Sequence, residues 1–392
     1  MTNNKGNKNF HYRMVAKTMH GLEDVLADEL IKLEAQNIRG LHRSVQFSGD
    51  QKLLYKANLH LRTAIRILKP IYKFKAHNED KLYNEIKSIN WEDFLKLNQT
   101  FAIDAVVSNS RFKNSLYVAQ KSKDAIADYF RQKTGQRPSV DVKNPDIRIN
   151  VYIDNNFCTV ALDSSGDALF KRGYRMIAGE APLNEVLAAG IIMKSEWDKK
   201  SSFVDAMCGS GTIVIEAALM AKNIAPGLSR KHFGFMNWVD YDINLFKSIC
   251  KDAREQIIPE LGFEIVGSDK NFKQVEEAKE NAKRAGVKEI VSFKQCIISD
   301  FRPPESPGVI IINPPYGERM SVEDINNFYH SIGDAFKKNF SGYDAFIFTG
   351  NGPAAKHIGL RTSRRIEMHN GPIECRLLKF EMYKGSRKVK AE

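Results

Sequence analysis

The spacing of apolar and polar positions changes near residue 168, and the change predicts two kinds of architecture. Before that point some segments repeat apolar residues at helical spacing and others alternate them with polar ones, which is typical of an α+β arrangement. The helices expected here are Gly21–Ala35, Gln51–Leu61, Lys81–Ile89 and Leu116–Gln132. The expected strands are His11–Lys17, Val45–Phe47, Ala64–Phe74, Phe101–Val107, Arg148–Ile153 and Phe157–Asp163. The last two strands flank Asp154-Asn155-Asn156, which predicts a hairpin, and Ser164–Asp167 is a candidate linker.

From residue 168 onward, apolar strand-like runs alternate with amphipathic helical ones, and this order favours a parallel sheet wound on both faces. The expected strands are Phe203–Asp205, Glu264–Gly267, Val291–Lys294, Val309–Ile312 and Ala345–Phe348. The expected helices are Leu183–Trp197, Ile213–Lys222, Phe272–Ala285 and Ile325–Phe340. Glu374–Met382 is a further strand, expected to run antiparallel at the end of the sheet. The fold class predicted from the pattern is therefore α/β.

Positive charge is concentrated in one part of the chain. The chain has 392 residues and a formal net charge of +12, and residues 51–150 contain 19 Lys and Arg against 10 Asp and Glu. A local basic excess is typical of a segment that binds a polyanion, because neutralising phosphates drives its affinity. The alternative is a solvated basic surface with no partner.

The sequence argues against several protein classes. No segment approaches ~18 uninterrupted apolar residues, which excludes a membrane-spanning helix, and the polar start MTNNKGNKN is unlike a secretory signal. The five cysteines are widely spaced and form no C-x-x-C pair, which favours reduced thiols in a cytoplasmic protein over disulfides or a zinc site. The nine histidines show no ligand-like spacing, so no metal is expected.

The segment Phe203–Thr212, FVDAMCGSGT, predicts a strand that ends in a glycine loop and opens a helix. Ligands of doubly wound sheets bind at such a point. Val214 stands where the dinucleotide fingerprint needs its third glycine, and no G-x-x-x-x-G-K-[ST] motif occurs, so NAD and nucleoside triphosphates are disfavoured. Asp205 suits a positively charged amino group and Asp269 suits a ribose diol, which together fit S-adenosylmethionine. The alternative role for either aspartate is helix capping.

A second motif, Ile310–Arg319 with the letters IIINPPYGER, runs an apolar strand directly into Asn-Pro-Pro-Tyr. The two prolines fix two φ angles and remove two donors, so the carbonyls there are rigid acceptors. Asn313 adds a side-chain carbonyl and Tyr316 adds a flat ring. Rigid acceptors beside an aromatic ring suit the exocyclic amine of a base that has been flipped out of its helix. The alternative is a turn that only ends the strand.

These two motifs together resemble the class I S-adenosylmethionine-dependent amino-methyltransferases. With NPPYGER, further stretches are similar to the bacterial THUMP-containing ribosomal RNA guanine-2-amino methyltransferases: Lys171–Arg175, Ala181–Glu185, Ile224–Leu228, Phe233–Phe235, Trp238 and Gly21–Asp24. The resemblance implies a Rossmann-like class I methyltransferase domain at 168–392, a ferredoxin-like subdomain at 1–75 and a THUMP domain at 76–167. Some relatives carry a second methyltransferase half, so one methylation is expected of a chain of this length.

The resemblance also implies site residues. Those expected to bind the cofactor are Asp205, Met207, Cys208, Gly209, Gly211, Thr212, Asp269, Lys270, Cys296 and Ile297. Those expected to hold the target amine are Asn313, Pro314, Pro315 and Tyr316. The family places an acid near the adenine amino group after the strand that contains Phe293, whereas this chain reads Gln295–Asp300 there. Either Asp300 takes that role or the backbone and Cys296 hold the adenine.

The expected partner is large-subunit ribosomal RNA, free or in an assembly intermediate, and residues 51–165 are expected to bind it. The basic residues expected to contact it are Lys121, Lys123, Arg131, Lys133 and Arg137, and the alternative for each is a solvated position. Rival functions are the same chemistry on guanine in tRNA or adenine in DNA, and a non-catalytic ribosome assembly factor. A thiouridine-forming enzyme is excluded, since neither an ATP loop nor a reactive cysteine is evident. The oligomeric state is left open.

Overall fold

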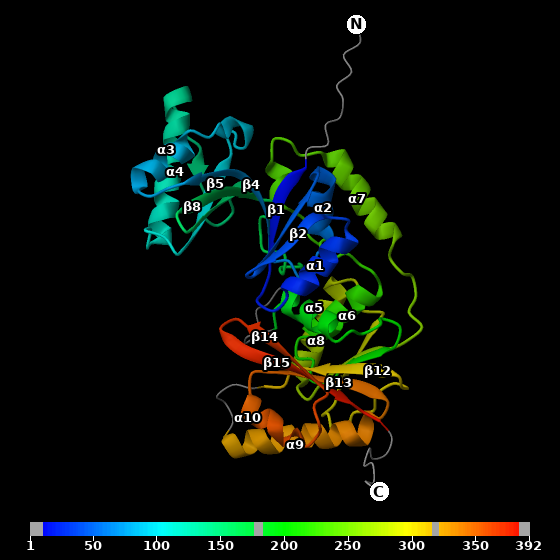
Figure 1. Cartoon of the computed structure of the whole chain (residues 1–392). Coiled ribbons are helices and arrows are strands. Elements are labelled where there is room, and N and C mark those ends of the chain that lie inside the picture. The colour runs from blue at the N-terminus through cyan, green and yellow to red at the C-terminus, as the bar shows by residue number, and fades with distance from the viewer. Residues whose placement is uncertain (1–10, 176–182, 316–320, 384–392) are drawn as a thin grey trace. The chain divides into compact units, whose positions relative to one another are not determined.

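The computed structural model describes residues 11–175, 183–315 and 321–383 (Figure 1). The chain divides into two compact units. The first unit comprises Met1–Thr18, Ala27–Leu169 and Arg230–Lys251, and the second comprises Met19–Leu26, Phe170–Ser229 and Asp252–Glu392. In the described part of the chain, no helix combines the length and the apolar character that crossing a membrane requires.

The first unit is built on a mixed sheet in the order β2-β3-β1-β4-β8-β7-β5-β6. Its strands are β1 (Tyr12–Lys17), β2 (Gln36–Leu41), β3 (Ser44–Gly49), β4 (Arg66–Lys75), β5 (Thr100–Ser108), β6 (Ser139–Val140), β7 (Ile147–Asp154) and β8 (Phe157–Asp163). The hairpin expected around Asn155 is confirmed, because β7 and β8 pair antiparallel across it. Strand β4 is long enough to pair with both β1 and β8, so one sheet runs through the unit.

Helices flank this sheet, and side chains cap the starts of three of them. They are α1 (Glu23–Lys32), α2 (Gln51–His60), α3 (Glu79–Lys87), η1 (Trp91–Asp93), α4 (Ser115–Thr134), η2 (Gly234–Asn237) and α7 (Ile243–Glu255). Asp50, Asn78 and Asn114 each accept a hydrogen bond from a backbone N–H of the first turn of α2, α3 and α4. Gly135 ends α4 in the left-handed conformation that favours glycine.

The first two residues of the expected linker Ser164–Asp167 are fully buried in the first unit, and the division between the two units follows Leu169. Ser164 N–H donates to Ile67 O at 2.9 Å, and Ile67 N–H donates to Ser165 Oγ at 3.0 Å. Asn58 bonds to both serine hydroxyls, at 2.9 and 2.7 Å. Small polar residues resemble a flexible joint in sequence, but here their hydroxyls satisfy the buried backbone of β4.

The second unit contains a sheet in the order β11-β10-β9-β12-β13-β15-β14. Its strands are β9 (Ser202–Asp205), β10 (Ile265–Asp269), β11 (Val291–Gln295), β12 (Gly308–Ile312), β13 (Tyr343–Thr349), β14 (Arg364–Asn370) and β15 (Ile373–Glu381). The first five strands in this order, from β11 to β13, are parallel to one another. Strand β15 runs antiparallel to β13, as expected. The unexpected strand β14, rather than β15, forms the edge.

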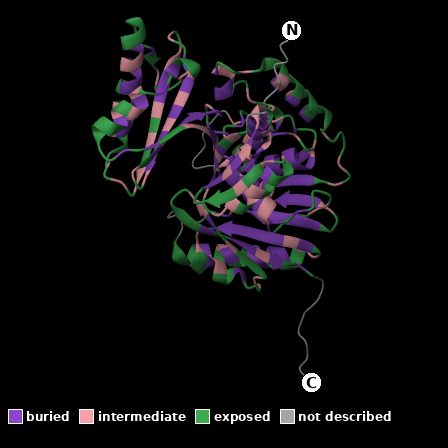
Figure 2. Cartoon of the chain, turned by 45° about the horizontal axis from the view of Figure 1, so that its top comes forward, coloured by how far each residue is buried: buried purple, intermediate pink, exposed green. Residues whose placement is uncertain are grey.

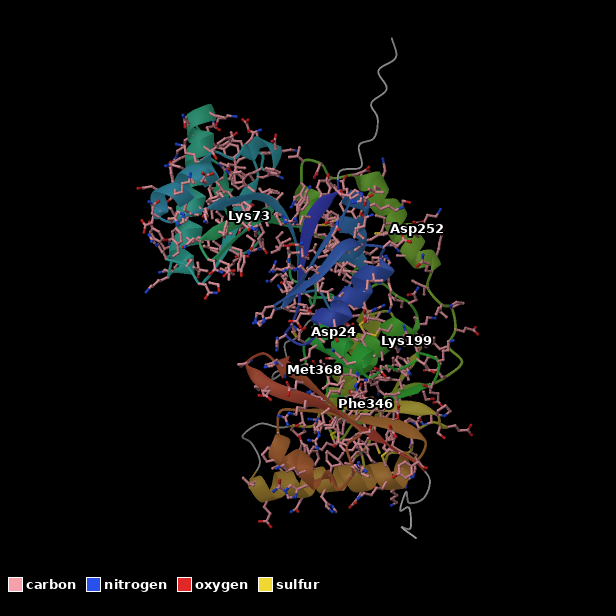
Figure 3. All side chains as sticks on the ribbon, viewed as in Figure 1. Asp24, Lys73, Lys199, Asp252, Phe346 and Met368 are labelled. Atoms are coloured by element: carbon pink, nitrogen blue, oxygen red, sulfur yellow. The ribbon has the colours of Figure 1, made fainter. Side chains whose placement is uncertain are left out.

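Helices cover both faces of this sheet, as the alternating pattern predicted. They are α5 (Glu185–Lys194), α6 (Thr212–Ala221), α8 (Phe272–Arg284), α9 (Val322–Asn339), α10 (Gly352–Ala355) and η3 (Lys356–Ile358). Figure 1 shows α9 and α10 on one face and α5, α6 and α8 on the other. Figure 2 shows its central strands buried, and Phe346 of β13 and Met368 of β14, labelled in Figure 3, belong to this core. The α/β fold class is confirmed.

Candidate active site at the strand ends of the second unit

The sequence-predicted motifs meet at the point where the strand order of the second sheet reverses. From β9 the chain proceeds outward to β10 and β11, and then returns to place β12 on the other side of β9. Strands β9 and β12 are parallel, with Val204 opposite Ile310, so the loop after Asp205 and the segment from Asn313 leave the same edge of the sheet. Such a topological switch point is where ligands bind in open α/β sheets.

The glycine loop between β9 and α6 has the shape that its sequence predicts. Gly209 and Gly211 both have positive φ, +50° and +86°. A Cβ on Gly211 would lie 3.0 Å from the Cβ of Ala278 in α8, whereas one on Gly209 would meet nothing closer than 3.6 Å. Gly211 therefore lets the loop pack against α8, and Gly209 keeps the outer side of the loop open.

Asp205 is the buried acid of the site, with 1% of its surface exposed. Its carboxylate accepts a hydrogen bond from Met207 N–H at 3.0 Å. Burial raises the pKa of Asp205 to about 8, and the nearby charge of Asp269 adds to the rise while the Met207 bond opposes it. A cationic group beside Asp205 would favour its ionised form.

Asp269, at the end of β10, joins the glycine loop to the next strand. One carboxylate oxygen accepts from Gly209 N–H at 3.0 Å and the other from Asn271 N–H at 2.9 Å. Asp269 O accepts from Cys296 N–H at 3.1 Å, which brings the expected adenine-side segment to the same place. Asp269 is thus held by backbone donors on both sides, and it does not cap a helix, because Asn271 caps α8.

Asn313 is the first residue after β12, and it differs from both aspartates. Its Oδ1 atom is buried and has no hydrogen-bond partner among the residues that the structure describes. Pro314 after it is buried and Pro315 is exposed. A buried acceptor without a donor costs about 1–3 kcal/mol. The arrangement therefore suits a ligand that brings an N–H group.

A buried charged cluster behind the glycine loop has no counterpart among the sequence-predicted site residues. Arg175 donates to Thr212 Oγ1 at the start of α6 and to Leu183 O at 3.2 Å, and forms an ion pair with Glu185 at 3.5 Å. Tyr174 donates a hydrogen bond to Glu216 Oε1 at 3.1 Å. Burial raises the pKa of Tyr174 well above its ordinary value, and the nearby charge of Glu216 adds to the rise. The signal was present, because a glutamate inside the apolar run TIVIEAALMA requires a buried partner.

The remaining predicted site residues are distributed as follows. Thr212 and Cys208 are buried, Met207 and Cys296 are half-buried, and Lys270 and Ile297 are exposed. Tyr316 lies outside the described residues. Asp300, the alternative adenine contact, is exposed and bonds to Ser299 Oγ at 3.2 Å.

The expected RNA contacts gather on one helix of the first unit. Lys121, Lys123, Arg131 and Lys133 belong to α4, and Arg137 follows Gly135. Three of them are already paired with carboxylates: Lys123 with Asp124 at 2.9 Å, Arg131 with Asp128 at 2.9 Å and Lys133 with Glu92 at 2.7 Å.

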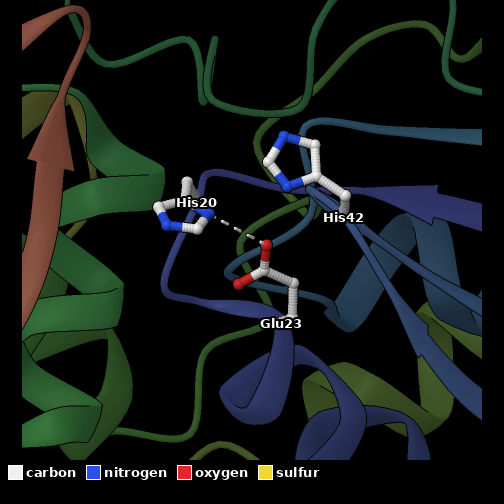
Figure 4. Close-up of side chains that lie close together, drawn as sticks. All are labelled: His20, Glu23 and His42. Atoms are coloured by element: carbon white, nitrogen blue, oxygen red, sulfur yellow. Dashed lines mark ion pairs between the residues drawn. The ribbon is translucent and has the colours of Figure 1, made fainter.

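His20 and Glu23 form a small cluster at the start of α1 (Figure 4). Their side chains make an ion pair at 3.7 Å, and the His20 ring lies edge-on to His369 with 4.8 Å between centroids. Gly21 N–H donates to Glu23 Oε2 at 2.7 Å. Glu23 therefore supports the turn that leads into α1.

Comparison with protein families matches nearly the whole chain. Three family models match: the RlmL ferredoxin-like domain at residues 13–68, the THUMP domain at 76–163 and the RMKL-like methyltransferase domain at 172–379. The last covers more than half of the chain.

Individual relatives agree with the family match. Ribosomal RNA large subunit methyltransferase K/L of Syntrophotalea carbinolica is 38% identical over 94% of this chain and 53% of its own length. The Synechocystis protein slr0064, provisionally named an RNA methyltransferase, is 39% identical over 94% of this chain and 96% of its own. A solved structure of SMU.472, provisionally called a methyltransferase and complexed with SAH, is 31% identical over 96% of this chain and 99% of that one, with a TM-score of 0.86.

The chain spans about half the length of two of these curated relatives, the K/L enzymes of Syntrophotalea carbinolica and Methylococcus capsulatus. The expected resemblance is confirmed by the three family models and by the identity of these relatives. The chain belongs to the family described as the RMKL-like methyltransferase domain, preceded by THUMP and ferredoxin-like domains.

Proposed function

We propose that this chain transfers a methyl group from S-adenosylmethionine to the exocyclic 2-amino group of guanine in large-subunit ribosomal RNA. The observation that carries the proposal is the buried Oδ1 of Asn313, which finds no donor among the described residues and follows β12 at the switch point. The K/L enzymes named above support ribosomal RNA as the substrate. We propose that the reaction takes place in the cytoplasm. We also propose that the chain has three modules: a ferredoxin-like subdomain at 1–75, a THUMP domain at 76–167 and a methyltransferase domain at 168–392.

The residues at the end of β9 and β10 fit the methyl donor. Bound S-adenosylmethionine supplies a methyl group on a sulfonium, already activated for transfer to a nucleophile. Asp205 is the acid suited to its amino group, because that carboxyl is buried and, within the described ranges, a single backbone N–H bonds to it. Asp269 is held by Gly209 and Asn271 in a position to accept from ribose hydroxyls. The SAH complex of SMU.472, 31% identical, supports this ligand.

Asn313 and Pro314 perform the positioning of the nucleophile. The amine of guanine is a poor nucleophile because its lone pair is delocalised into the ring. Asn313 Oδ1 and the Pro314 carbonyl accept its two N–H groups, so the lone pair is directed toward the methyl group. The nitrogen–carbon bond forms as the carbon–sulfur bond breaks, and the amine then loses a proton to solvent. Proximity and orientation therefore supply most of the acceleration.

The product of the reaction tests the proposal. The purified chain is incubated with S-adenosylmethionine and with total RNA from cells that lack its gene, and the nucleosides are analysed by mass spectrometry. The proposal predicts 2-methylguanosine in large-subunit RNA. Formation of 2-methylguanosine only in tRNA would keep the chemistry and replace the substrate. Methylated adenine, or no methylated nucleoside at all, would contradict the proposal and favour a DNA enzyme or an assembly factor.

A further inference from the structure

In the part of the first unit's sheet formed by β5, β7 and the adjoining ends of β8 and β4, one face is covered by helices and the other face is open. Helices α3 and α4 pack against each other, and α4 packs on β5. Along β7 the odd positions Ile147, Ile149, Val151 and Ile153 are buried, while Tyr152 between them is 40% exposed. On β8 Cys158 and Val160 are buried and Phe157 is 44% exposed. Because side chains alternate along strands, the exposed residues share the face opposite the helices.

The register of the strands brings exposed apolar side chains together on that open face. Val106 of β5, 50% exposed, lies opposite Tyr152 of β7. Tyr152 lies opposite Thr159 of β8, two residues from Phe157. Thr159 and Phe157 in turn lie opposite Lys73 and Lys75 of β4. Exposed apolar side chains that cluster on one face mark an interaction site more often than exposed apolar side chains that stand alone.

Lysines border these rings without carboxylate partners. Lys73, labelled in Figure 3, and Lys75 place their Nζ atoms 5.4 and 5.1 Å from the centre of the Phe157 ring. Lys17 Nζ lies 6.0 Å from the centre of the Tyr152 ring. Within the described ranges, none of the three lysines has a carboxylate at ion-pair distance. These six residues, Lys17, Lys73, Lys75, Val106, Tyr152 and Phe157, are called the open-face patch below.

Two carboxylates lie near the open-face patch: Asp104, and Asp154, which stands opposite Phe157. Arg148 forms an ion pair with Asp104 at 3.2 Å on the same face. Asp154 accepts hydrogen bonds from the amides of Asn109 and Asn155, at 3.4 and 3.3 Å. Hydrogen bonds from neutral amides leave Asp154 charged, so three lysines stand against this one carboxylate beside the rings and the net charge there is positive. The helical face differs, since most of the basic side chains on α4 are already neutralised by neighbouring carboxylates.

We infer that the open-face patch binds single-stranded RNA, with bases stacked on Tyr152 and Phe157 and phosphates bound by Lys17, Lys73 and Lys75. Flat rings accept any base, and unpaired lysines release counterions when they bind phosphates. A duplex buries its bases and offers nothing for these rings to stack on. This inference rests on the proposed function only in taking RNA as the substrate. It places the principal RNA contact on the sheet, whereas the sequence predicted it on α4.

Binding of a fluorescent single-stranded RNA of about twelve nucleotides to the full chain tests the inference. Tyr152→Ala and Phe157→Ala are each expected to weaken binding about tenfold or more, because each removes one stacking ring. Tyr152→Phe keeps a ring and is expected to bind within about twofold of the unchanged chain. Tyr83→Ala is the matched control, because Tyr83 on α3 also carries two lysines over its ring, at 5.7 and 5.2 Å. Equal thermal midpoints establish that the variants are folded.

The outcomes separate this inference from the proposed function. Unchanged affinity in Tyr152→Ala and Phe157→Ala would overturn the open-face patch, whatever RNA the chain methylates. A loss in Tyr83→Ala alone would overturn it in favour of the helical face. Equally strong competition by a duplex RNA would also overturn it. Conversely, ring-dependent binding of single strands would stand even if no 2-methylguanosine were formed, and then only the proposed reaction would fall.

Discussion

The two sides of the switch point in the second sheet treat their polar groups differently. At the ends of β9 and β10, Asp205 and Asp269 accept hydrogen bonds from Met207, Gly209 and Asn271 of the loop itself. At the end of β12, Asn313 Oδ1 is buried and has no donor in the described part of the chain. The first side is complete as a scaffold, and the second side lacks a hydrogen bond that a substrate can supply. The difference supports the proposal that the first side holds the cofactor and the second receives the reacting amine.

A second asparagine makes the contrast sharper. Asn351 follows β13, the strand next to β12, and its Oδ1 accepts from Ala354 N–H at 2.9 Å, which caps α10. Both asparagines therefore leave the same edge of the same sheet, but Asn351 has a structural role. An acceptor that the fold does not use points to a ligand, and one that caps a helix does not.

The largest expected effect is on methyl transfer in Asn313→Ala. Losing an acceptor that orients the reacting group is expected to lower kcat by about a hundredfold or more. Binding of S-adenosylmethionine, measured by calorimetry, stays within about twofold, because Asp205 and Asp269 are unchanged. Asn351→Ala is the matched control, with a cost of about 1 kcal/mol in unfolding free energy from the lost cap and turnover close to that of the unchanged chain. Equal turnover losses in the two variants would remove the distinction between the asparagines.

A smaller effect is expected from adding one methyl group to the glycine loop. Gly211→Ala combines a φ of +86° with a Cβ 3.0 Å from that of Ala278, and we expect about 2–4 kcal/mol of destabilisation. Gly286→Ala is the control, since its φ is +72° but its Cβ would meet no atom within 4 Å, so only the backbone cost of about 1 kcal/mol remains. Chemical denaturation gives both values. A Gly211→Ala variant as stable as Gly286→Ala would show that the loop does not need its close packing against α8.

The smallest expected effect is a pH dependence of cofactor binding. The folded-state pKa of Asp205 is raised from 3.8 to about 8, so this group favours the folded state most at low pH and that contribution is lost as pH rises from about 4 to about 8. A cationic ligand prefers the ionised carboxylate, so the affinity for S-adenosylmethionine is expected to rise about tenfold from pH 6 to pH 7, and binding is expected to release a proton. Asp205→Asn should remove this rise. The same pH dependence of affinity in Asp205→Asn and in the unchanged chain would show that the cationic group does not bind beside Asp205.

The sequence was most informative where strands are buried on both faces. The runs Phe203–Asp205 and Val309–Ile312 are apolar throughout because helices cover both sides of the sheet, so their ends, and the motifs after them, could be located. Strand β2, which is mostly exposed, and the edge strand β14, which is partly exposed, lack such a run, and neither was predicted. Helix α7 was missed although Phe246, Ile249 and Ala253 have helical spacing and are buried.

The state of each site residue could not be predicted in the same way. That Asn313 Oδ1 meets no donor among the described residues depends on tertiary structure such as the pairing of β9 with β12, strands about a hundred residues apart in sequence. The apolar run around Glu216 signals that this glutamate needs a buried partner, but which residues pair with Glu216 and Glu185 depends on how α5 and α6 pack. The roles of the individual site residues, including Tyr316, stay predictions that the experiments above address.

Replacing guanosine by inosine in the RNA tests the central claim most directly, because inosine lacks only the 2-amino group of guanosine. Two transcripts of the same large-subunit RNA fragment, one with each nucleoside, are incubated with the chain and radiolabelled S-adenosylmethionine. Label in the guanosine transcript and none in the inosine transcript is the predicted result. Equal label in both would contradict the account, since the methyl group would then be carried by some other atom than the amine that Asn313 is proposed to hold.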